Sequence, residues 1–175
     1  NKIILTASGG PLLKIPLSKI NNLKIKDILK HPNWSMGKKI SVDSSTMINK
    51  VFEIIEAKNI FKIDLDRLSI LIHPKSYVHA ILSFNDGMIK IIAHDTTMEI
   101  PIFNSIYNNE KINFSSKDIN IEKINNLNLS KIDKKKFPLI KILSMIPDKI
   151  SLFETVLVSA NDELVSLYLK KKIRY

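Results

Sequence analysis

The stretch from residue 31 to residue 53 constrains this chain more than any other, and it reads HPNWSMGKKISVDSSTMINKVFE. Its first half carries a histidine, a tryptophan and a glycine among loop-forming residues. Its second half predicts a helix start at a serine, followed by Asn49, Lys50 and Glu53 within about one helical turn. Together these side chains can hold a phosphate group, cover it and reach a metal ion.

The chain carries a formal net charge of +10, which raises the question of a nucleic-acid partner. Almost all of the basic residues are lysines, with arginine only at Arg67 and Arg174. No nucleic-acid-binding motif accompanies the charge, and the aromatic residues are not interleaved with it as stacking platforms. We therefore interpret the excess as a compositional bias and predict no nucleic-acid partner, although the charge can help to attract an anionic substrate.

Hydropathy and cysteine content exclude several classes of protein. Hydrophobic residues make up 45% of the chain and charged residues 25%, as in ordinary globular proteins. No run approaches the roughly 20 apolar residues that a membrane span needs, so no membrane partner is expected. Cysteine is absent, which excludes disulfides and thiolate chemistry. The chain starts at Asn1 without an apolar signal segment, so we expect a fragment or a processed product.

The pattern of apolar residues predicts a mixed α and β protein. Strands are expected at residues 2–7, 40–42, 68–73, 77–84 and 88–93, and helices at residues 18–29, 45–61, 102–107, 137–145 and 152–171. A hairpin is expected across Asp86-Gly87, because this pair supports the positive φ of tight turns. The predicted fold class is α/β of the α+β type: a small mixed sheet packed by helices over residues 1–107, a linker over 108–136 and a partial helical domain over 137–175.

Two turns of the chain are candidate anion sites. The helix predicted to start after Ser44 is capped by Asp43 or Ser44, and unpaired amide groups at a helix start attract anions. Lys50 lies little more than a turn further on. The Ser8-Gly9-Gly10 turn is the second candidate, since glycine lets backbone amides approach an oxyanion closely. A plain helix cap and a plain turn remain the alternatives.

Glu53 lies three residues after Lys50 and four after Asn49, so the three side chains can share one helix face. An ion pair on a solvated face is one interpretation. The other is a metal carboxylate beside a phosphate site, with Glu53 as the ligand. One carboxylate cannot hold a divalent ion alone, and no other residue shows ligand spacing. Any further metal ligands are therefore expected outside this chain.

Trp34, the only tryptophan, lies in the predicted loop between His31 and Met36. It either anchors that loop on the core or forms a lid that shields a reaction from water. His73 and His79 lie on or beside predicted strands and match no metal-site spacing, so both are interpreted as structural histidines.

Several blocks of the sequence resemble the catalytic domain of the 1-deoxy-D-xylulose 5-phosphate reductoisomerase family. The matching text is LTASGGP, HPNWSMGKKISVDSSTMINK, EIIEA, LIHPKSYVH, DG, Met98 with IPI, FPLIK and a weaker SANDE, in the family's order along almost the whole chain. The resemblance implies conversion of the sugar phosphate 1-deoxy-D-xylulose 5-phosphate to 2-C-methyl-D-erythritol 4-phosphate. It also implies NADPH, a divalent metal (Mg²⁺ or Mn²⁺, or Co²⁺) and a homodimer formed through the catalytic domain. The host compartment would be a bacterial cytoplasm or a plastid-like organelle.

The resemblance also implies a role for each motif residue. Glu53 would ligate the metal and touch the substrate, Gly37 would lie near the nicotinamide cofactor, and His31 would act with Glu53 in catalysis. Residues implied to bind the substrate, chiefly its phosphate, are Ser8, His31, Ser44, Asn49 and Lys50. Residues implied to form the closing lid or to line the pocket are Trp34, Met36 and Met98.

The chain departs from the family pattern in a few places. The family's NADPH-binding domain and its Asp-Ser-Glu metal-ligand segment are expected upstream of Asn1, so these 175 residues alone are not expected to turn over substrate. Leu12 stands where the family usually has phenylalanine, and Thr96-Thr97 stand where it has Pro-Asp. A non-catalytic dimerisation remnant of the enzyme and a basic nucleic-acid-binding module are the alternatives.

Overall fold

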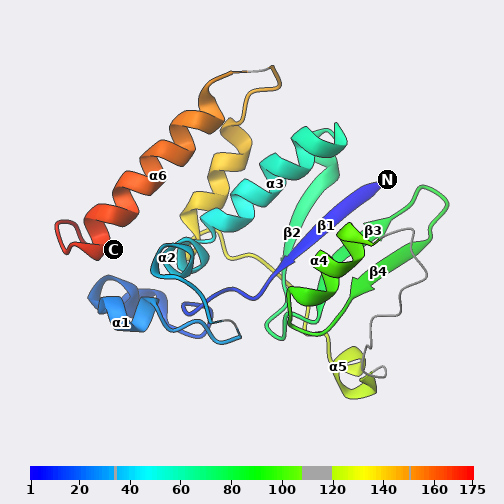
Figure 1. Cartoon of the computed structure of the whole chain (residues 1–175), viewed down its shortest axis with the longest axis horizontal. Helices are drawn as coiled ribbons and strands as arrows, with labels where there is room; N and C mark the ends of the chain where they lie inside the picture. The colour runs from blue at the N-terminus through cyan, green and yellow to red at the C-terminus, as the bar shows by residue number, and fades with distance from the viewer. Residues whose placement is uncertain (34, 108–119, 150) are drawn as a thin grey trace.

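The computed structural model describes residues 1–33, 35–107, 120–149 and 151–175 (Figure 1). At its centre is a five-stranded mixed sheet with strand order β4-β3-β1-β2-β5. The central strand β1 (Lys2–Ala7) pairs parallel with β2 (Leu68–Ile72) and antiparallel with β3 (Val78–Ser83). The edges are β4 (Ile89–Ala93) and the short β5 (Ser130–Lys131), both antiparallel to their neighbours. The predicted small mixed sheet is therefore confirmed.

The hairpin between β3 and β4 forms where the turn residues predict it. Gly87 has φ of +87°, and the Asp86 carboxylate accepts a hydrogen bond from the Met88 amide at 2.9 Å. The Phe84 amide closes the turn onto the Met88 carbonyl at 2.9 Å. The local chemistry of Asp86-Gly87 thus supports this connection, and Asn1 also holds it, because the Asn85 amide donates to Asn1 Oδ1 at 3.1 Å.

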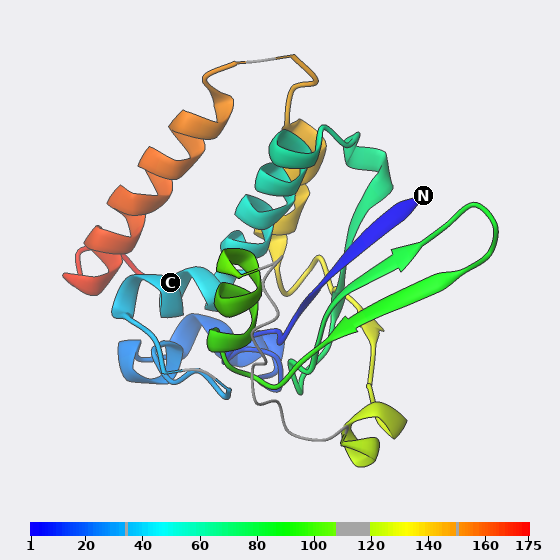
Figure 2. The same cartoon turned by 45° about the vertical axis from the view of Figure 1, so that its right-hand side comes forward.

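Helices pack on the sheet, and further helices pack on those. They are α1 (Ile25–Ile28), α2 (Lys38–Thr46), α3 (Ile48–Phe61), α4 (Glu99–Ile106), α5 (Ile121–Asn125) and α6 (Phe153–Leu169), with 3-10 helices η1 (Leu17–Asn22), η2 (Leu65–Arg67) and η3 (Pro138–Met145). Helix α3 packs on β1 and β2 and also contacts η3, while α6 contacts α2 (Figures 1 and 2). The molecule therefore has a sheet, a helical layer on it, and α6 outside that layer. No helix among the described residues is long and apolar enough to span a bilayer.

The strand predicted at residues 40–42 is wrong, and so is the cap predicted at Asp43 or Ser44. These residues lie inside α2, whose N-cap is Gly37. A short apolar run such as Ile40–Val42 does not by itself distinguish a strand from a helix. Burial decides it here, because Val42 and Ser45 on the inner face of α2 are 4% and 0% exposed. The long helix begins only at Ile48, after a break at Met47.

Residues after the predicted linker join the same core as the residues before it. Phe137 and Tyr168, 2% and 6% exposed, belong to one buried cluster with Leu12, Ile48 and Val51. The connecting segment also contributes α5 and the edge strand β5. The domain boundaries predicted at residues 107 and 136 remain predictions.

Gly10 holds the turn after β1 against the end of α2. Its φ is +60°, and a Cβ built on it would lie 2.8 Å from the Ser44 carbonyl oxygen. Residues other than glycine are therefore disfavoured at this position for two reasons, the positive φ and the clash of a Cβ with the Ser44 carbonyl oxygen. This close approach brings Ser8 and Ser44 to one place in the fold.

We predict that Gly10→Ala lowers the free energy of unfolding by about 1–3 kcal/mol, because it adds backbone strain and a clash with backbone. Gly87→Ala is the matched control, since Gly87 also has positive φ (+87°) but has no atom within 4 Å of the place where a Cβ would lie. Urea denaturation of both variants measures the difference. Equal losses in the two variants would contradict the close contact between Gly10 and α2.

Candidate active site

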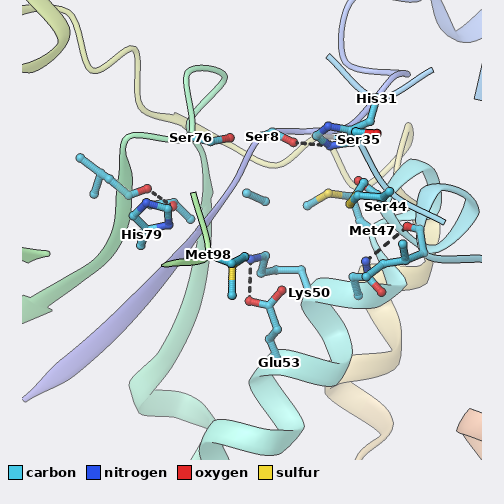
Figure 3. A pocket seen from close by; sticks show the side chains of 16 residues that line it. Ser8, His31, Ser35, Ser44, Met47, Lys50, Glu53, Ser76, His79 and Met98 are labelled. Atoms are coloured by element: carbon cyan, nitrogen blue, oxygen red, sulfur yellow. Dashed lines mark hydrogen bonds and ion pairs between the residues drawn. The ribbon is translucent and has the colours of Figure 1, made fainter. Parts of the chain in front are cut away.

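A cavity of about 560 Å³ lies between the end of β1, the loop after His31, the α2–α3 junction and β3 (Figure 3). Its wall contains the following predicted site residues: Ser8, His31, Met36, Ser44, Asn49, Lys50, Glu53 and Met98. The structure therefore brings together residues that are up to 90 positions apart in the sequence, as the motifs predict. Their individual roles remain predictions.

Ser8 and His31 form a polar pair on one side of the cavity. The Asn33 amide donates to His31 Nδ1 at 3.1 Å, so in the neutral ring the proton lies on Nε2. That nitrogen then donates to Ser8 Oγ at 3.2 Å, and the Gly10 amide donates to the same oxygen at 3.1 Å. Burial lowers the pKa of His31, which favours this neutral form. The Ser8 hydroxyl hydrogen is left to bond an anionic oxygen.

The anion-attracting helix start belongs to α3 and not to a helix beginning beside Ser44. Ser44 lies in the last turns of α2, and its carbonyl accepts from the Met47 amide at 3.2 Å. Met47 has φ of 65°, a left-handed conformation that ends α2 and turns the chain into α3. Asn49 and Lys50 then occupy the first turn of α3, where the helix dipole favours a negative charge. The correction moves the helix start by three residues but leaves Ser44 in the cavity wall.

Lys50 and Glu53 form an ion pair within α3, with Nζ 2.6 Å from Oε2. The Lys50 side chain is 14% exposed and that of Glu53 is 45% exposed. The ion pair predicted as the simpler interpretation is therefore present, but it lines the cavity instead of a solvated face. Figure 3 shows the two charged groups directed toward each other.

Glu53 offers a carboxylate to a hard cation but not a complete site. Mg²⁺ and Mn²⁺ prefer about six oxygen ligands, of which a single side chain supplies one or two. Among the residues that the structure describes, no three histidine, aspartate or glutamate side chains gather closely enough to hold a metal. The chemistry of Glu53 fits one ligand of a set whose other members come from elsewhere.

Two predicted residues are not placed in the cavity by the structure. Gly37 is the exposed N-cap of α2 and does not line the wall, so its proximity to a nicotinamide remains a prediction. Trp34 lies outside the described residues. Asn33, which directly precedes Trp34 in the sequence, donates from Nδ2 to the Pro74 carbonyl and to Ser76 Oγ, each at 2.8 Å.

Sequence reasoning missed part of the wall, namely Thr6, Ala7, Ser35, Ile40, Met47, Ser76, Val78 and His79. His79 is the clearest case, because its place on a predicted strand indicates only a structural role. Val78 pairs with Ala93 and Ala80 with Ile92, so His79 is the extra residue of a β-bulge. A regular strand points consecutive side chains to opposite faces, whereas the bulge lets Val78 and His79 both line the cavity. Nothing in the sequence signals the bulge.

His73 fits its predicted structural role. The side chain is fully buried, and Nδ1 bonds the Leu127 carbonyl. A carbonyl only accepts, so Nδ1 carries the proton. This contact fixes the connecting segment to the end of β2, close to β5.

Two family models match the chain. One, described as 1-deoxy-D-xylulose 5-phosphate reductoisomerase C-terminal domain, matches residues 1–61, and the other, described as DXP reductoisomerase C-terminal domain, matches residues 95–175. A 1-deoxy-D-xylulose 5-phosphate reductoisomerase from Pelagibacter ubique is 60% identical over 174 residues, and one from Wolbachia pipientis wMel is 42% identical over 177 residues. Each alignment covers 99% of this chain and 45% of the relative. The chain thus spans a little under half the length of these relatives.

Solved structures agree with the fold. A crystal structure of DOX-P reductoisomerase in complex with NADPH, fosmidomycin and magnesium superimposes with a TM-score of 0.90 at 32% identity, covering 99% of this chain and 42% of that one. The 1-deoxy-D-xylulose 5-phosphate reductoisomerase from Zymomonas mobilis in complex with NADPH gives a TM-score of 0.88 at 29% identity, covering 99% and 44%. The mixed sheet and its helices therefore follow the architecture of these enzymes.

Stability is predicted to fall as the pH falls from 6.5 toward about 4. Burial, with His94 nearby, lowers the pKa of His79 from 6.5 to about 4, so in this window the unfolded chain binds more protons than the folded one. The lowered pKa values of His31 and His73 act in the same direction. Urea denaturation between about pH 4.5 and 7.5 should show a weaker pH dependence for His79→Asn than for the parent protein. An unchanged slope would contradict the burial of an uncharged His79.

Proposed function

We propose that this chain, which belongs to the 1-deoxy-D-xylulose 5-phosphate reductoisomerase family, is the substrate-binding part of an enzyme that converts 1-deoxy-D-xylulose 5-phosphate to 2-C-methyl-D-erythritol 4-phosphate. The single observation that carries the proposal is the shared cavity of Ser8, Ser44, Lys50 and Glu53. Those residues place hydroxyl donors, an ammonium and a carboxylate around one space of sugar-phosphate size.

The phosphate would lie at the junction of α2 and α3. There the hydroxyls of Ser8 and Ser44, the amide of Asn49 and the ammonium of Lys50 border the cavity. Bonds from charged or oriented donors to a phosphate dianion are stronger than bonds between neutral groups. The amides in the first turn of α3 add a favourable dipole. His31 supports this end by holding the Ser8 oxygen in place.

The end of the substrate that faces the metal would lie at Glu53, one helical turn further along α3. Glu53 would supply one carboxylate to Mg²⁺ or Mn²⁺, and the family's upstream Asp-Ser-Glu segment would supply others. When bound, the metal polarises carbonyl and hydroxyl oxygens of the substrate as a Lewis acid. In the present structure Lys50 compensates the charge of Glu53, so the ion pair keeps both groups satisfied inside the cavity.

The reduction would use NADPH, which supplies a hydride when bound. Met36 and Met98 line the cavity and would exclude water around the transferred hydride. Gly37, at the entrance to α2, would allow the cofactor to approach the backbone closely. The support is the relatedness to enzymes solved with NADPH and with magnesium. Since the relatives from Pelagibacter ubique and Wolbachia pipientis are bacterial, we infer a bacterial cytoplasmic setting.

We also infer that the protein is a homodimer whose contact includes β4. This strand is at the edge of the sheet, and Ile89, Ile91 and Ile92 are 64%, 51% and 48% exposed. An apolar edge strand without a partner is an association surface. A second copy of the chain is the occupant that the family resemblance favours.

Glu53→Gln is predicted to reduce metal-dependent kcat on the order of 100-fold or more, because the carboxylate ligand is lost without a change in size. The assay uses the gene product that contains this chain, with NADPH and Mn²⁺. Glu56→Gln is the matched control, since Glu56 lies on the same helix, is exposed and does not line the cavity. Near-normal activity of Glu53→Gln would remove the assigned role, and an inactive parent protein would favour a non-catalytic remnant.

Ile89→Lys combined with Ile91→Lys is predicted to convert the dimer to a monomer, because burying two ammonium groups costs several kcal/mol. Sedimentation equilibrium at micromolar concentration measures the association. Ile60→Lys serves as the control, since Ile60 is also 64% exposed but lies at the far end of α3. A dimer that survives the double change would place the contact elsewhere.

A further inference from the structure

The imidazole rings of His79 and His94 stack at the edge of the cavity. Their centroids are 3.6 Å apart and their planes differ by 9°. His79 lines the cavity, whereas His94 follows β4 and does not. The second ring therefore covers one face of the first.

The hydrogen bonds define the protonation of both rings. His79 Nε2 lies 3.2 Å from the His94 carbonyl oxygen, which can only accept, so Nε2 carries the proton. His79 Nδ1 is then an acceptor in the neutral ring, and no described residue donates to it. His94 Nδ1 in turn donates to the Asp95 carbonyl at 2.7 Å.

The contacts behind His94 restrain it as well. The Asp95 carboxylate is 2.6 Å from Lys123 Nζ on α5, and the same ammonium lies 5.1 Å from the centre of the Tyr77 ring. Tyr77 directly precedes β3, and the His94 amide donates to the Tyr77 carbonyl at 3.0 Å. The start of β3 and the end of β4, which lie at the same end of the strand pair, are thus both connected to α5.

We propose that His94 is a positioning residue that holds His79 as an uncharged hydrogen-bond acceptor on the sheet side of the cavity. The substrate class rests on the proposed function. A sugar phosphate would then meet its positive partner at Lys50 on α3, while His79 accepts a hydrogen bond from a substrate hydroxyl. The arrangement gives the cavity two chemically distinct ends and so orients the ligand.

Charge neighbours support the uncharged state of His79. Burial is the main cause that lowers its pKa to about 4, and His94, Lys50 and His73 also disfavour a positive ring. These groups come from three directions, namely the end of β4, helix α3 and the end of β2. A protonated His79 would offer the phosphate a second cationic partner and weaken the distinction between the ends.

The inference predicts different effects for two substitutions of His94. His94→Ala uncovers the His79 ring, so the pKa of His79 should rise by about one unit or more toward 6.5. His94→Phe keeps a flat ring over His79 and keeps the backbone carbonyl, and it loses only the secondary charge effect of His94, so the pKa should rise less than in His94→Ala and the Nε2–H form should remain. Imidazole ¹⁵N and ¹³C NMR titrations of the gene product containing this chain measure both quantities, and circular dichroism checks that each variant folds.

An unchanged His79 titration in His94→Ala would overturn the inference, as would an equal change in His94→Phe. A second measurement tests the consequence for the cavity with sulfate, which keeps its charge across the range used. Sulfate affinity should rise several-fold as the pH is lowered from about 7 to 5.5 in His94→Ala relative to His94→Phe, because only the former gains a charged His79.

The two measurements separate this inference from the proposed function. If the parent protein binds no sulfate while the NMR titrations behave as expected, the phosphate site is wrong and the role of His94 stands. If sulfate binds and competes with the sugar phosphate but the titrations of the parent protein and His94→Ala coincide, the site stands and the role of His94 fails.

Discussion

The left-handed backbone at Met47 is the constraint on which the site depends. Without it, α2 and α3 would continue as one helix, and Ser44 would point away from Lys50 and Glu53. A non-glycine residue in this conformation costs about 1–2 kcal/mol. Burial of the Met47 side chain, 3% exposed, together with Val42 and Ile48 on either side, offsets this cost. The strained residue thus lies between α2 and α3, where the end of one helix and the start of the other line the same cavity.

Three further contacts bring the other walls to that junction. The approach of Gly10 to Ser44 attaches the end of β1, and Asn33 attaches the loop after His31 to the residues before β3. The bulge at His79 turns one more side chain inward. The site therefore draws on several elements whose mutual positions are set by the sheet, so no single segment carries it. Its charged pair, Lys50 with Glu53, lies on α3, which packs between the sheet and η3.

The buried network beside α2 shows how the C-terminal helix supports this arrangement. Asp43 is 2% exposed, yet it accepts hydrogen bonds from Lys39 at 2.8 Å and from Asn161 of α6 at 2.9 Å. Lys39 also reaches Asp162 at 3.0 Å. A buried carboxylate is stable only when paired in this way, so α6 contributes to holding α2 in place. That dependence agrees with the shared core of residues before and after the connecting segment.

Local patterns in the sequence were sufficient for much of the structure. The Asp86-Gly87 hairpin, the strands at 2–7 and 68–73 and the helix containing Lys50 and Glu53 follow from turn chemistry and periodicity. The motif blocks also identified half of the residues in the cavity wall, including Ser8 and Met98, which lie far apart in the chain. Their resemblance to one enzyme family implies that these residues bind the same substrate, which periodicity cannot reveal.

Other features were decided only by tertiary structure. Residues 40–42 are helical because α2 buries Ser41 and Val42 against the core while Ile40 stays exposed, a pattern that a short apolar run does not encode. The inward turn of His79 depends on a one-residue mismatch with β4, which exists only once the two strands pair. The sequence by itself determined which chemical groups the site contains, because those groups are side chains. Their orientation depended on packing between distant elements, because backbone breaks such as Met47 are stable only when the rest of the core holds them.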